Sequence, residues 1–264
     1  MQNNVHHGSK PIKVALASSQ VGPNLEQNFL TIAGIVKQVA EKKTQLVCFP
    51  ECALGGLFEI DNYQIARGLT VEIPGQITKR VARLAKVYSV YIAIGFLERE
   101  GHRIYDSAVI FSDTGEIILK HRRLNPCWRA PDAPEDKYGE GHEFNTVNTP
   151  FGRIGLAICG DTGDSAVVRL IRKAKPDILI VPRNANFNDF SYNQERWDRE
   201  KVWACHQAID IGATVFFINA YSERDAGGAY GGSMVISEQG KILMESKIGK
   251  PSVLFYQHHP GQQL

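Results

Sequence analysis

The 264-residue sequence has no long hydrophobic run and almost no net charge. A helix that crosses a bilayer needs roughly 20 consecutive apolar residues, and no run approaches that length. The 30 basic and 28 acidic side chains leave a formal net charge of +2, which provides no electrostatic footprint for nucleic acid or an anionic membrane. We therefore expect a globular protein with no nucleic-acid partner and no membrane partner.

Cysteine is also scarce, and its pattern excludes two further classes of protein. The five cysteines are odd in number and irregularly spaced, which argues against a disulfide framework. They do not pair with histidines at zinc-ligand spacing, so we expect no metal site. Free thiols are typical of a reducing compartment, and we expect the cytoplasm. Residues 1–10 are polar, without the apolar segment of a signal peptide, and are expected to form a flexible tail before a single domain over 11–264.

Short apolar runs and amphipathic segments follow one another along the chain. Helices are expected at 24–44, 75–90, 164–176 and 192–212, and strands at 12–20, 44–51, 91–100, 103–113, 116–122, within 143–159, and at 177–183, 213–220 and 231–246. Because helices alternate with strands and hairpins also occur, we expect an α/β protein with mixed sheets and outer helices. Residues 124–142 form a loop rich in proline and glycine, and loops of that length are usually functional.

Three of the expected strands end on a charged or reactive residue. Glu51 follows "VCFP", a basic cluster ends "ILKHRR", and Cys159 ends "GLAIC". Ligands of α/β sheets bind at strand ends, where polar groups converge without disturbing the core. A carboxylate can act as general base, a cation can stabilise a thiolate or an oxyanion, and a thiol can act as nucleophile. A free cysteine alone is usually a small buried hydrophobe, so the inference depends on all three together.

These stretches resemble the motifs of a known family. "FPECALGG" is similar to the glutamate motif of the nitrilase superfamily of carbon–nitrogen hydrolases, "GEIILKHRRLNP" to its lysine motif, "FGRIGLAICGD" to its cysteine motif and "AYGGSMVISEQGKIL" to the hairpin that follows. The resemblance covers nearly the whole chain. It implies a four-layer α–β–β–α sandwich with two mixed β-sheets, assembled as a homodimer or larger homo-oligomer.

The resemblance also implies a reaction and its residues. Family members hydrolyse non-peptide C–N bonds in small molecules such as amides, carbamoyl compounds and nitriles, or transfer the acyl group, without a cofactor. Cys159 corresponds to the nucleophile that forms a thioester, and Glu51 to the general base. Glu135 in the long loop is the best match for a second family glutamate, and Glu140 is a weaker one.

The sequence departs from the family at several positions near the expected site, among them "GDTGDS" after Cys159 and Asp210 in place of a longer acid. Arg123 occupies the position of the catalytic lysine, and arginine stays charged where lysine can lose a proton. Lys120 lies three positions earlier on an extended segment, and alternation points it to the opposite face. Gly160 follows the nucleophile where the family often has a larger side chain, leaving space in the acyl pocket. An alternative is therefore a catalytically inactive relative that binds a small ligand or a partner protein.

Further candidates for substrate binding come from segments beside these motifs. Trp128 lies in the loop after the basic cluster, and Arg183 and Asn184 follow the strand expected at 177–183. Arg183 could bind a substrate carboxylate through its planar guanidinium. The sequence does not identify the substrate or the acyl acceptor.

Overall fold

The first of two β-sheets carries most of the amino-terminal half of the chain. The computed structural model describes residues 11–186, 193–224 and 227–260, so the expected tail at 1–10 lies outside the described residues. The sheet has the strand order β13-β1-β2-β3-β4-β5, and β6 pairs with β4. The strands are β1 (Ile12–Ser18), β2 (Leu46–Cys48), β3 (Tyr91–Glu100), β4 (Arg103–Phe111), β5 (Ile117–Arg122), β6 (Tyr138–Gly139) and β13 (Ser252–His258).

The second sheet has the order β12-β11-β10-β9-β8-β7. Its strands are β7 (Thr146–Thr149), β8 (Gly152–Leu156), β9 (Ile178–Arg183), β10 (Thr214–Asn219), β11 (Ser233–Ile236) and β12 (Ile242–Glu245). Parallel pairs, such as β8 with β9, and antiparallel pairs, such as β10 with β11, occur together, so this sheet is mixed, as is the first.

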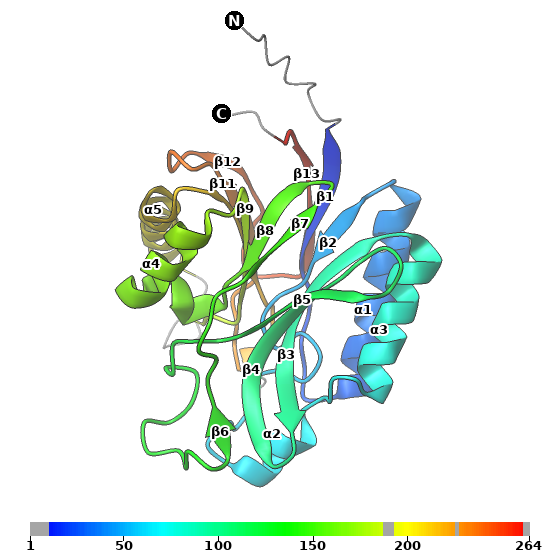
Figure 1. Cartoon of the computed structure of the whole chain (residues 1–264), viewed down its shortest axis with the longest axis vertical. Helices are drawn as coiled ribbons and strands as arrows, with labels where there is room; N and C mark the ends of the chain where they lie inside the picture. Colours follow the sequence, from blue (N-terminus) through cyan, green and yellow to red (C-terminus); the bar gives the residue numbers. More distant parts are fainter. Residues whose placement is uncertain (1–10, 187–192, 225–226, 261–264) are drawn as a thin grey trace, which may run out of the picture.

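Helices cover the outer face of each sheet (Figure 1). Residues of α1 (Leu25–Glu41) and α3 (Gln76–Tyr88) pack on the first sheet, and those of α4 (Ser165–Ala174) and α5 (Gln194–Ile211) on the second. Each of α1, α4 and α5 begins where an Asn or Asp side chain accepts hydrogen bonds from the first turn, as at Asn24. The predicted four-layer α–β–β–α sandwich with two mixed sheets is confirmed.

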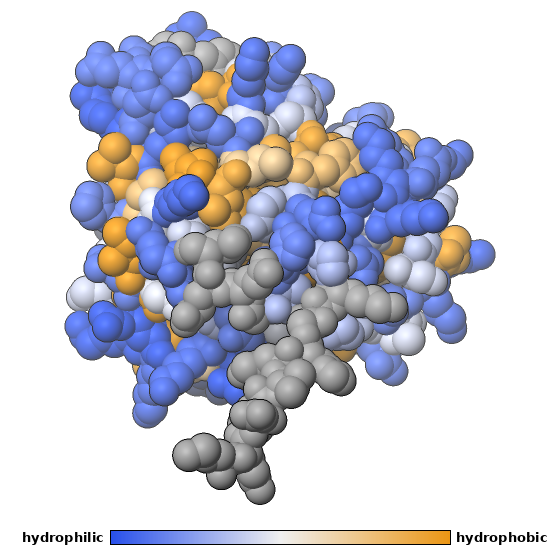
Figure 2. Space-filling view, turned by 90° about the horizontal axis from the view of Figure 1, so that it is seen from above, coloured by the Kyte–Doolittle hydropathy of each residue, from blue (hydrophilic) through white to orange (hydrophobic). Residues whose placement is uncertain are grey.

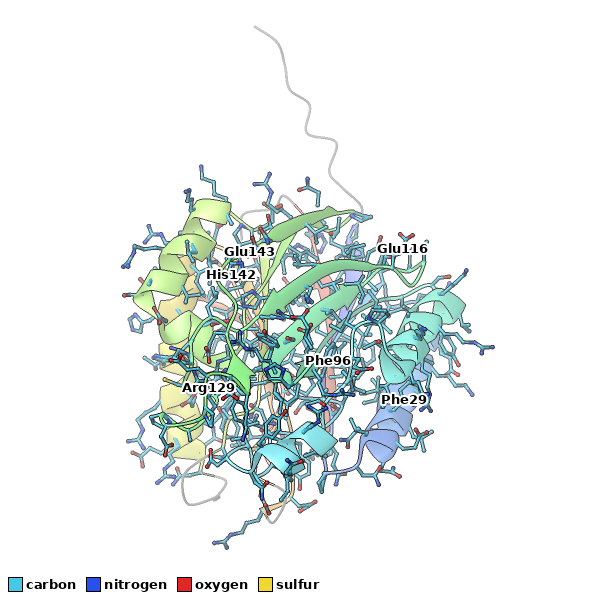
Figure 3. The ribbon with its side chains drawn as sticks, turned by 60° about the horizontal axis from the view of Figure 1, so that its bottom comes forward. Phe29, Phe96, Glu116, Arg129, His142 and Glu143 are labelled. Atoms are coloured by element: carbon cyan, nitrogen blue, oxygen red, sulfur yellow. The ribbon has the colours of Figure 1, made fainter. Side chains whose placement is uncertain are left out.

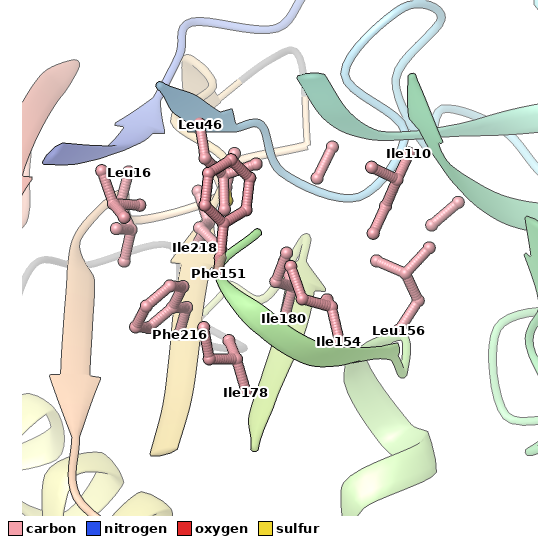
Figure 4. Close-up of a cluster of buried hydrophobic side chains, with 14 of the residues drawn as sticks. Leu16, Leu46, Ile110, Phe151, Ile154, Leu156, Ile178, Ile180, Phe216 and Ile218 are labelled. Atoms are coloured by element: carbon pink, nitrogen blue, oxygen red, sulfur yellow. The ribbon is translucent and has the colours of Figure 1, made fainter. Parts of the chain in front are cut away.

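The core between the sheets follows from side-chain alternation along the strands (Figure 4). On β1, Leu16 points inward between the sheets, whereas Ala15 points outward to the helices. Leu46 and Ile110 of the first sheet meet Ile154, Ile180 and Phe216 of the second in one buried cluster. This core fixes the two sheets face to face, and with them the strand ends that carry the predicted site residues.

Four elements were not expected from the sequence. They are β6, β13, the short helix α2 (Tyr63–Gly68) and the 3₁₀ helix η1 (Cys159–Gly163). β13 pairs antiparallel with β1 and alternates between the inner core, through Leu254, and the helix side, through Val253. Its short apolar run after Pro251 was the signal that could have identified it.

The surface is mixed in polarity. Figure 2 shows a band of apolar residues between hydrophilic regions on the face seen from above. Within the described ranges, no helix combines the length and the apolar character needed to cross a membrane.

Candidate active site

Glu51 lies in a buried turn just beyond β2. Its side chain is inaccessible to solvent. The turn packs directly on β3, where Gly95 donates its amide hydrogen to the Pro50 carbonyl at 3.2 Å. A Cβ at position 95 would lie 2.8 Å from the Cα of Glu51, so a glycine is required for this approach. The sheet therefore holds the carboxylate in one position.

Arg123 follows β5 and points into the same buried region. Its amide hydrogen bonds to the Asp106 carbonyl of β4 at 2.8 Å, which continues the β4–β5 pairing by one residue. Its guanidinium Nη1 lies 2.9 Å from Oε1 of Glu51 and 3.4 Å from Oδ2 of Asp106. The side chain is only 4% exposed. Arg123 thus joins two buried carboxyl groups.

Lys120 points elsewhere. Its ammonium group lies 2.9 Å from Oε1 of Glu98 and is partly exposed. Arg122 binds the same carboxylate through Nε and Nη2. Lys120 therefore belongs to a cluster around Glu98, and Arg123 supplies the cation beside Glu51.

Cys159 stands at the sharp junction between β8 and η1. Its φ angle is +42°, a left-handed conformation that is uncommon for a residue with a side chain. Such backbone strain persists only where surrounding contacts enforce it, and it is frequent at active sites. β8 ends at Leu156 and η1 begins at Cys159, so the thiol lies just beyond the carboxyl end of the strand.

Asp161 supplies those contacts. It is fully buried, and its Oδ2 accepts hydrogen bonds from the Ile158 amide at 2.9 Å and from Nε2 of His121 at 2.8 Å. Its Oδ1 accepts from the amides of Leu124 and Asn125, both at 2.9 Å. These hydrogen bonds lower the pKa of Asp161 against the opposing effect of burial. The Asp161 carboxylate therefore connects the turn at Cys159 to the segment that follows Arg123.

The charges around Cys159 act in opposite directions. Burial and the Glu51 carboxylate raise the pKa of its thiol, whereas Arg123, Arg183 and a hydrogen bond from the Asn184 amide lower it, and the net pKa is about 11. The balance favours a protonated thiol at neutral pH. A cysteine in this state needs a general base to become a nucleophile, and a carboxylate whose charge acts on it is close at hand.

Gly160 and Arg123 depend on each other for space. A Cβ at position 160 would lie 2.5 Å from Nη2 of Arg123 and 3.0 Å from Oδ1 of Asn125. The larger guanidinium therefore occupies space that a side chain at position 160 would need. The space that the sequence predicts for the acyl pocket is at least partly filled by Arg123.

The long loop contributes differently from the expectation. Glu135 is exposed, and its charge acts on Arg129. Glu140 is half-buried and lies 2.6 Å from Nε of Arg129, which is labelled beside β6 in Figure 3. The structure therefore does not bring Glu135 into the cluster around Cys159, because the acidic residues of the loop neutralise an arginine of the same loop.

Trp128 is buried behind the glutamate turn. It is 4% exposed and packs with Cys52 and Tyr138, whose ring lies 5.8 Å away, edge to face. Its indole nitrogen has no hydrogen-bond partner. The ring supports the turn that carries Glu51, and its role in substrate binding stays a prediction.

Arg183 and Asn184 do lie beside Cys159. The charge of Arg183 and the amide of Asn184 both act on Cys159. Arg183 is 6% exposed, and its Nη2 lies 3.0 Å from Oε2 of Glu200 on α5. A substrate carboxylate would therefore share this guanidinium with Glu200.

Two buried acids of the site, Asp106 and Asp161, were missed at the sequence level. Asp106 lies in a strand of mostly apolar and aromatic residues, a pattern that marks a buried charge with a specific partner. Asp161 lies inside the cysteine motif, but no separate role is predicted for it from the sequence. Across the described ranges, no group of three or more His, Cys, Asp or Glu side chains is placed to hold a metal ion.

A buried glutamate, a cation and a strained cysteine at the strand ends of a four-layer sandwich define a nitrilase-type protein. The family model described as "Carbon-nitrogen hydrolase" matches residues 13–257. The chain belongs to this family, and the predicted membership is confirmed.

Relatives of known sequence are distant but extensive. The chain is 24% identical to "Omega-amidase NIT2" of Bos taurus over 92% of its own length and 87% of the relative. It is 25% identical to "Bifunctional nitrilase/nitrile hydratase NIT4A" of Lupinus angustifolius over 79% of its length. It spans 66% of that plant protein.

Solved structures share the fold. Nit3 of Saccharomyces cerevisiae, a member of branch 10 of the nitrilase superfamily, gives a TM-score of 0.78 at 23% identity, covering 96% of this chain and 92% of that one. A glutamate-to-glutamine mutant of the amidase from Nesterenkonia sp. AN1, with the acetamide moiety of fluoroacetamide covalently added at its active site cysteine, gives a TM-score of 0.75 at 16% identity, covering 98% of this chain and 94% of that one.

Proposed function

We propose that this protein hydrolyses the C–N bond of a small amide through a thioester on Cys159. The observation that carries the proposal is the buried Glu51–Arg123 pair, with Nη1 and Oε1 2.9 Å apart, whose charges both act on the Cys159 thiol. Base, cation and thiol come from three distant segments. Their convergence at the strand ends supports a catalytic site.

In the first step Glu51 takes the proton from the Cys159 thiol as the sulfur attacks the substrate carbon. The S–C bond forms, and the carbonyl electron pair moves to oxygen. The C–N bond then breaks as the carbonyl re-forms, and the amine or ammonia leaves with the proton held by Glu51. Water next attacks the thioester, Glu51 accepts its proton, and the acid departs as the thiol regains a proton.

Arg123 acts here as a fixed charge. An arginine does not lose its proton at physiological pH, so Arg123 stabilises the thiolate without carrying a proton to the leaving group. The neighbouring carboxylates raise its pKa further, although burial opposes them. Glu51 is then the group that both receives and returns the proton.

The substrate class is an amide, which the omega-amidase and amidase relatives support. Nitriles and carbamoyl compounds are the other substrates of the proposal, and acyl transfer to an acceptor other than water is a further outcome. The test is ammonia release from a panel of small amides, carbamoyl compounds and nitriles by the wild type and Cys159→Ala. Cys127→Ala, which removes an exposed cysteine, is the control.

The alternative is a family member that binds a ligand without chemistry. Arg123 and the raised pKa of the Cys159 thiol are the observations that favour it. A compound from the panel that binds wild type and Cys159→Ala equally, with no product in either, would establish this alternative.

A catalytic role for Glu135 remains a prediction that rests on the motif resemblance alone.

We also propose a homo-oligomer in the cytoplasm. Large apolar side chains are exposed on α4 and α5, and such residues mark interaction surfaces: Leu170, Val202, Trp203 and Ile209. The five cysteines are unpaired, which suits a reducing compartment. Light scattering of the purified protein tests the assembly, and a mass of one chain would contradict it.

A further inference from the structure

Asp106 is a buried carboxyl group in the candidate active site that the proposed steps do not use. It lies on β4 and is 1% exposed. The ionisable groups whose charges act on it come from three other segments: Glu51 and Cys52 beyond β2, Arg123 beyond β5, and Asp161 in η1. It is therefore as central to the cluster as Glu51.

Few donors reach the Asp106 carboxyl group. Its Oδ2 lies 3.4 Å from Nη1 of Arg123, and its Oδ1 lies 3.9 Å from Sγ of Cys52. By contrast, Glu98 accepts four hydrogen bonds of 2.7 to 2.9 Å. A buried carboxylate without strong donors is disfavoured relative to the neutral acid.

The charge balance leads to the same conclusion. Glu51 and Asp106 flank a single guanidinium, and the shorter contact, 2.9 Å, belongs to Glu51. Burial and the Glu51 charge raise the pKa of Asp106 well above its usual value, and a side-chain hydrogen bond with Glu51 adds to the effect. A hydrogen bond between two carboxyl groups requires a proton on one of them. Paired acids that share one proton are a known solution to such crowding.

We propose that Asp106 keeps its proton at neutral pH and donates it in a hydrogen bond to Glu51, which leaves the charge of Arg123 available to the Cys159 thiolate. Asp106 is then a positioning residue for the reaction. The inference rests on the proposed function for its catalytic meaning, but the protonation state itself can be measured without a substrate.

A neutral Asp106 leaves one anion beside Arg123 throughout the first step. Before proton transfer, the Glu51 carboxylate balances Arg123. Afterwards Glu51 is neutral, and the Cys159 thiolate balances Arg123. With Asp106 neutral, each state pairs one anion with one cation, so neither state contains an uncompensated ion. An ionised Asp106 would compete with the thiolate for the single guanidinium.

Infrared difference spectroscopy of the purified protein at neutral pH tests the proton directly. We expect a carboxylic-acid C=O band in wild type that is absent in Asp106→Asn and retained in Glu98→Gln, because Glu98 is ionised. A band unchanged in Asp106→Asn would overturn the proposal. If that variant does not fold, 13C labelling of aspartate carboxyl groups in the unmutated protein should shift the band, and an unshifted band would equally overturn it.

The pH profile of kcat/KM tests the role of this proton. Wild type should lose activity at the alkaline pH where Asp106 loses its proton. In Asp106→Asn, this alkaline fall in kcat/KM should move to higher pH. A purely structural residue would change kcat/KM by the same factor at every pH, which would contradict the positioning role. If no compound is hydrolysed, the proposed function fails while the infrared result still decides the state of Asp106.

Discussion

Two clusters of charged side chains involve residues of β5 or the residue that follows it, one around Glu98 and the other around Glu51. They differ in how many hydrogen bonds the carboxylate oxygens accept. Around Glu98, both carboxylate oxygens accept strong hydrogen bonds from Lys120, Arg122 and Ser107. Around Glu51, only Oε1 accepts a hydrogen bond from a charged donor, Arg123, and in the described part of the chain Oε2 has no donor beyond the proton proposed for Asp106. Both glutamates are buried.

The difference teaches how one strand can supply stability and chemistry together. A carboxylate with a complete set of donors is held in its charged form, and the pKa of Glu98 is lowered to about 2 by Arg122, Ser107 and Lys120 against the opposing effect of burial. Such a group cannot exchange protons near neutral pH. Glu51 has a less complete set of donors, and its charge acts on the Cys159 thiol, where a base is needed.

The largest expected effect comes from replacing one glutamate at a time. Glu51→Gln removes the general base and should lower kcat/KM by about 10³-fold. Glu98→Gln removes a structural carboxylate and should leave kcat/KM within a few-fold. Ammonia release under identical conditions checks both, and equal losses in the two variants would erase the distinction between the clusters.

The next effect tests the fit between Gly160 and Arg123. Gly160→Ala places a methyl group 2.5 Å from Nη2 of Arg123 and should displace the guanidinium from Glu51. We expect a loss of about 10²-fold in kcat/KM with little change in melting temperature. Adding Arg123→Lys, with its smaller head group, should recover part of the loss.

Gly163→Ala is the matched control for this variant. It lies in the same η1 turn, and its added Cβ would come no closer than 3.5 Å to Trp203, which is an ordinary contact. Full activity in Gly160→Ala, or an equal loss in Gly163→Ala, would show that the predicted crowding at Arg123 does not matter.

Glu98→Gln should have its main effect on stability. Loss of several charge-assisted hydrogen bonds should lower the unfolding free energy by about 2 kcal/mol. Because the pKa falls from 4.5 to about 2 on folding, this contribution is complete above pH 4.5 and is lost as pH falls through 2. Denaturant melts between pH 3 and pH 7 should therefore show a weaker acid dependence in the variant, and parallel curves would contradict the assignment.

The smallest effect is expected at Lys120. Its side chain is 37% exposed, so Lys120→Gln should cost less than about 1 kcal/mol and leave hydrolysis unchanged. This variant also tests whether Lys120 replaces the family's lysine. A hundredfold fall in kcat/KM, with the melting temperature preserved, would assign the catalytic role to Lys120.

Sequence reasoning predicted the sandwich correctly and proposed three site residues, and both rest on local signals. Alternating strands and helices indicate the layers, and Glu51, Arg123 and Cys159 each end or follow an apolar run. Asp106 was missed because its meeting with Arg123 depends on the register between β4 and β5, which no short motif encodes. Glu135 was placed by motif resemblance in a loop, where no side-chain period fixes which way a residue points.

The absence of a side chain at Gly160 shows the same limit of prediction from sequence. The sequence indicates that glycine leaves space, but only the packed structure shows that Arg123 fills it. Arg123 and Gly160 each suggest a disrupted site when either residue is considered alone. Together they form a compact arrangement in which a larger cation and a missing side chain compensate each other.

Covalent labelling of the nucleophile tests the central claim most directly. The protein would be incubated at neutral pH with fluoroacetamide, the compound whose acetamide moiety is added to the active site cysteine in a mutant of the Nesterenkonia amidase. Peptide mass spectrometry would then locate the adduct. We predict modification of Cys159 and not of the exposed Cys127. Modification of Cys127 with Cys159 left intact would contradict the assignment of Cys159 as the nucleophile.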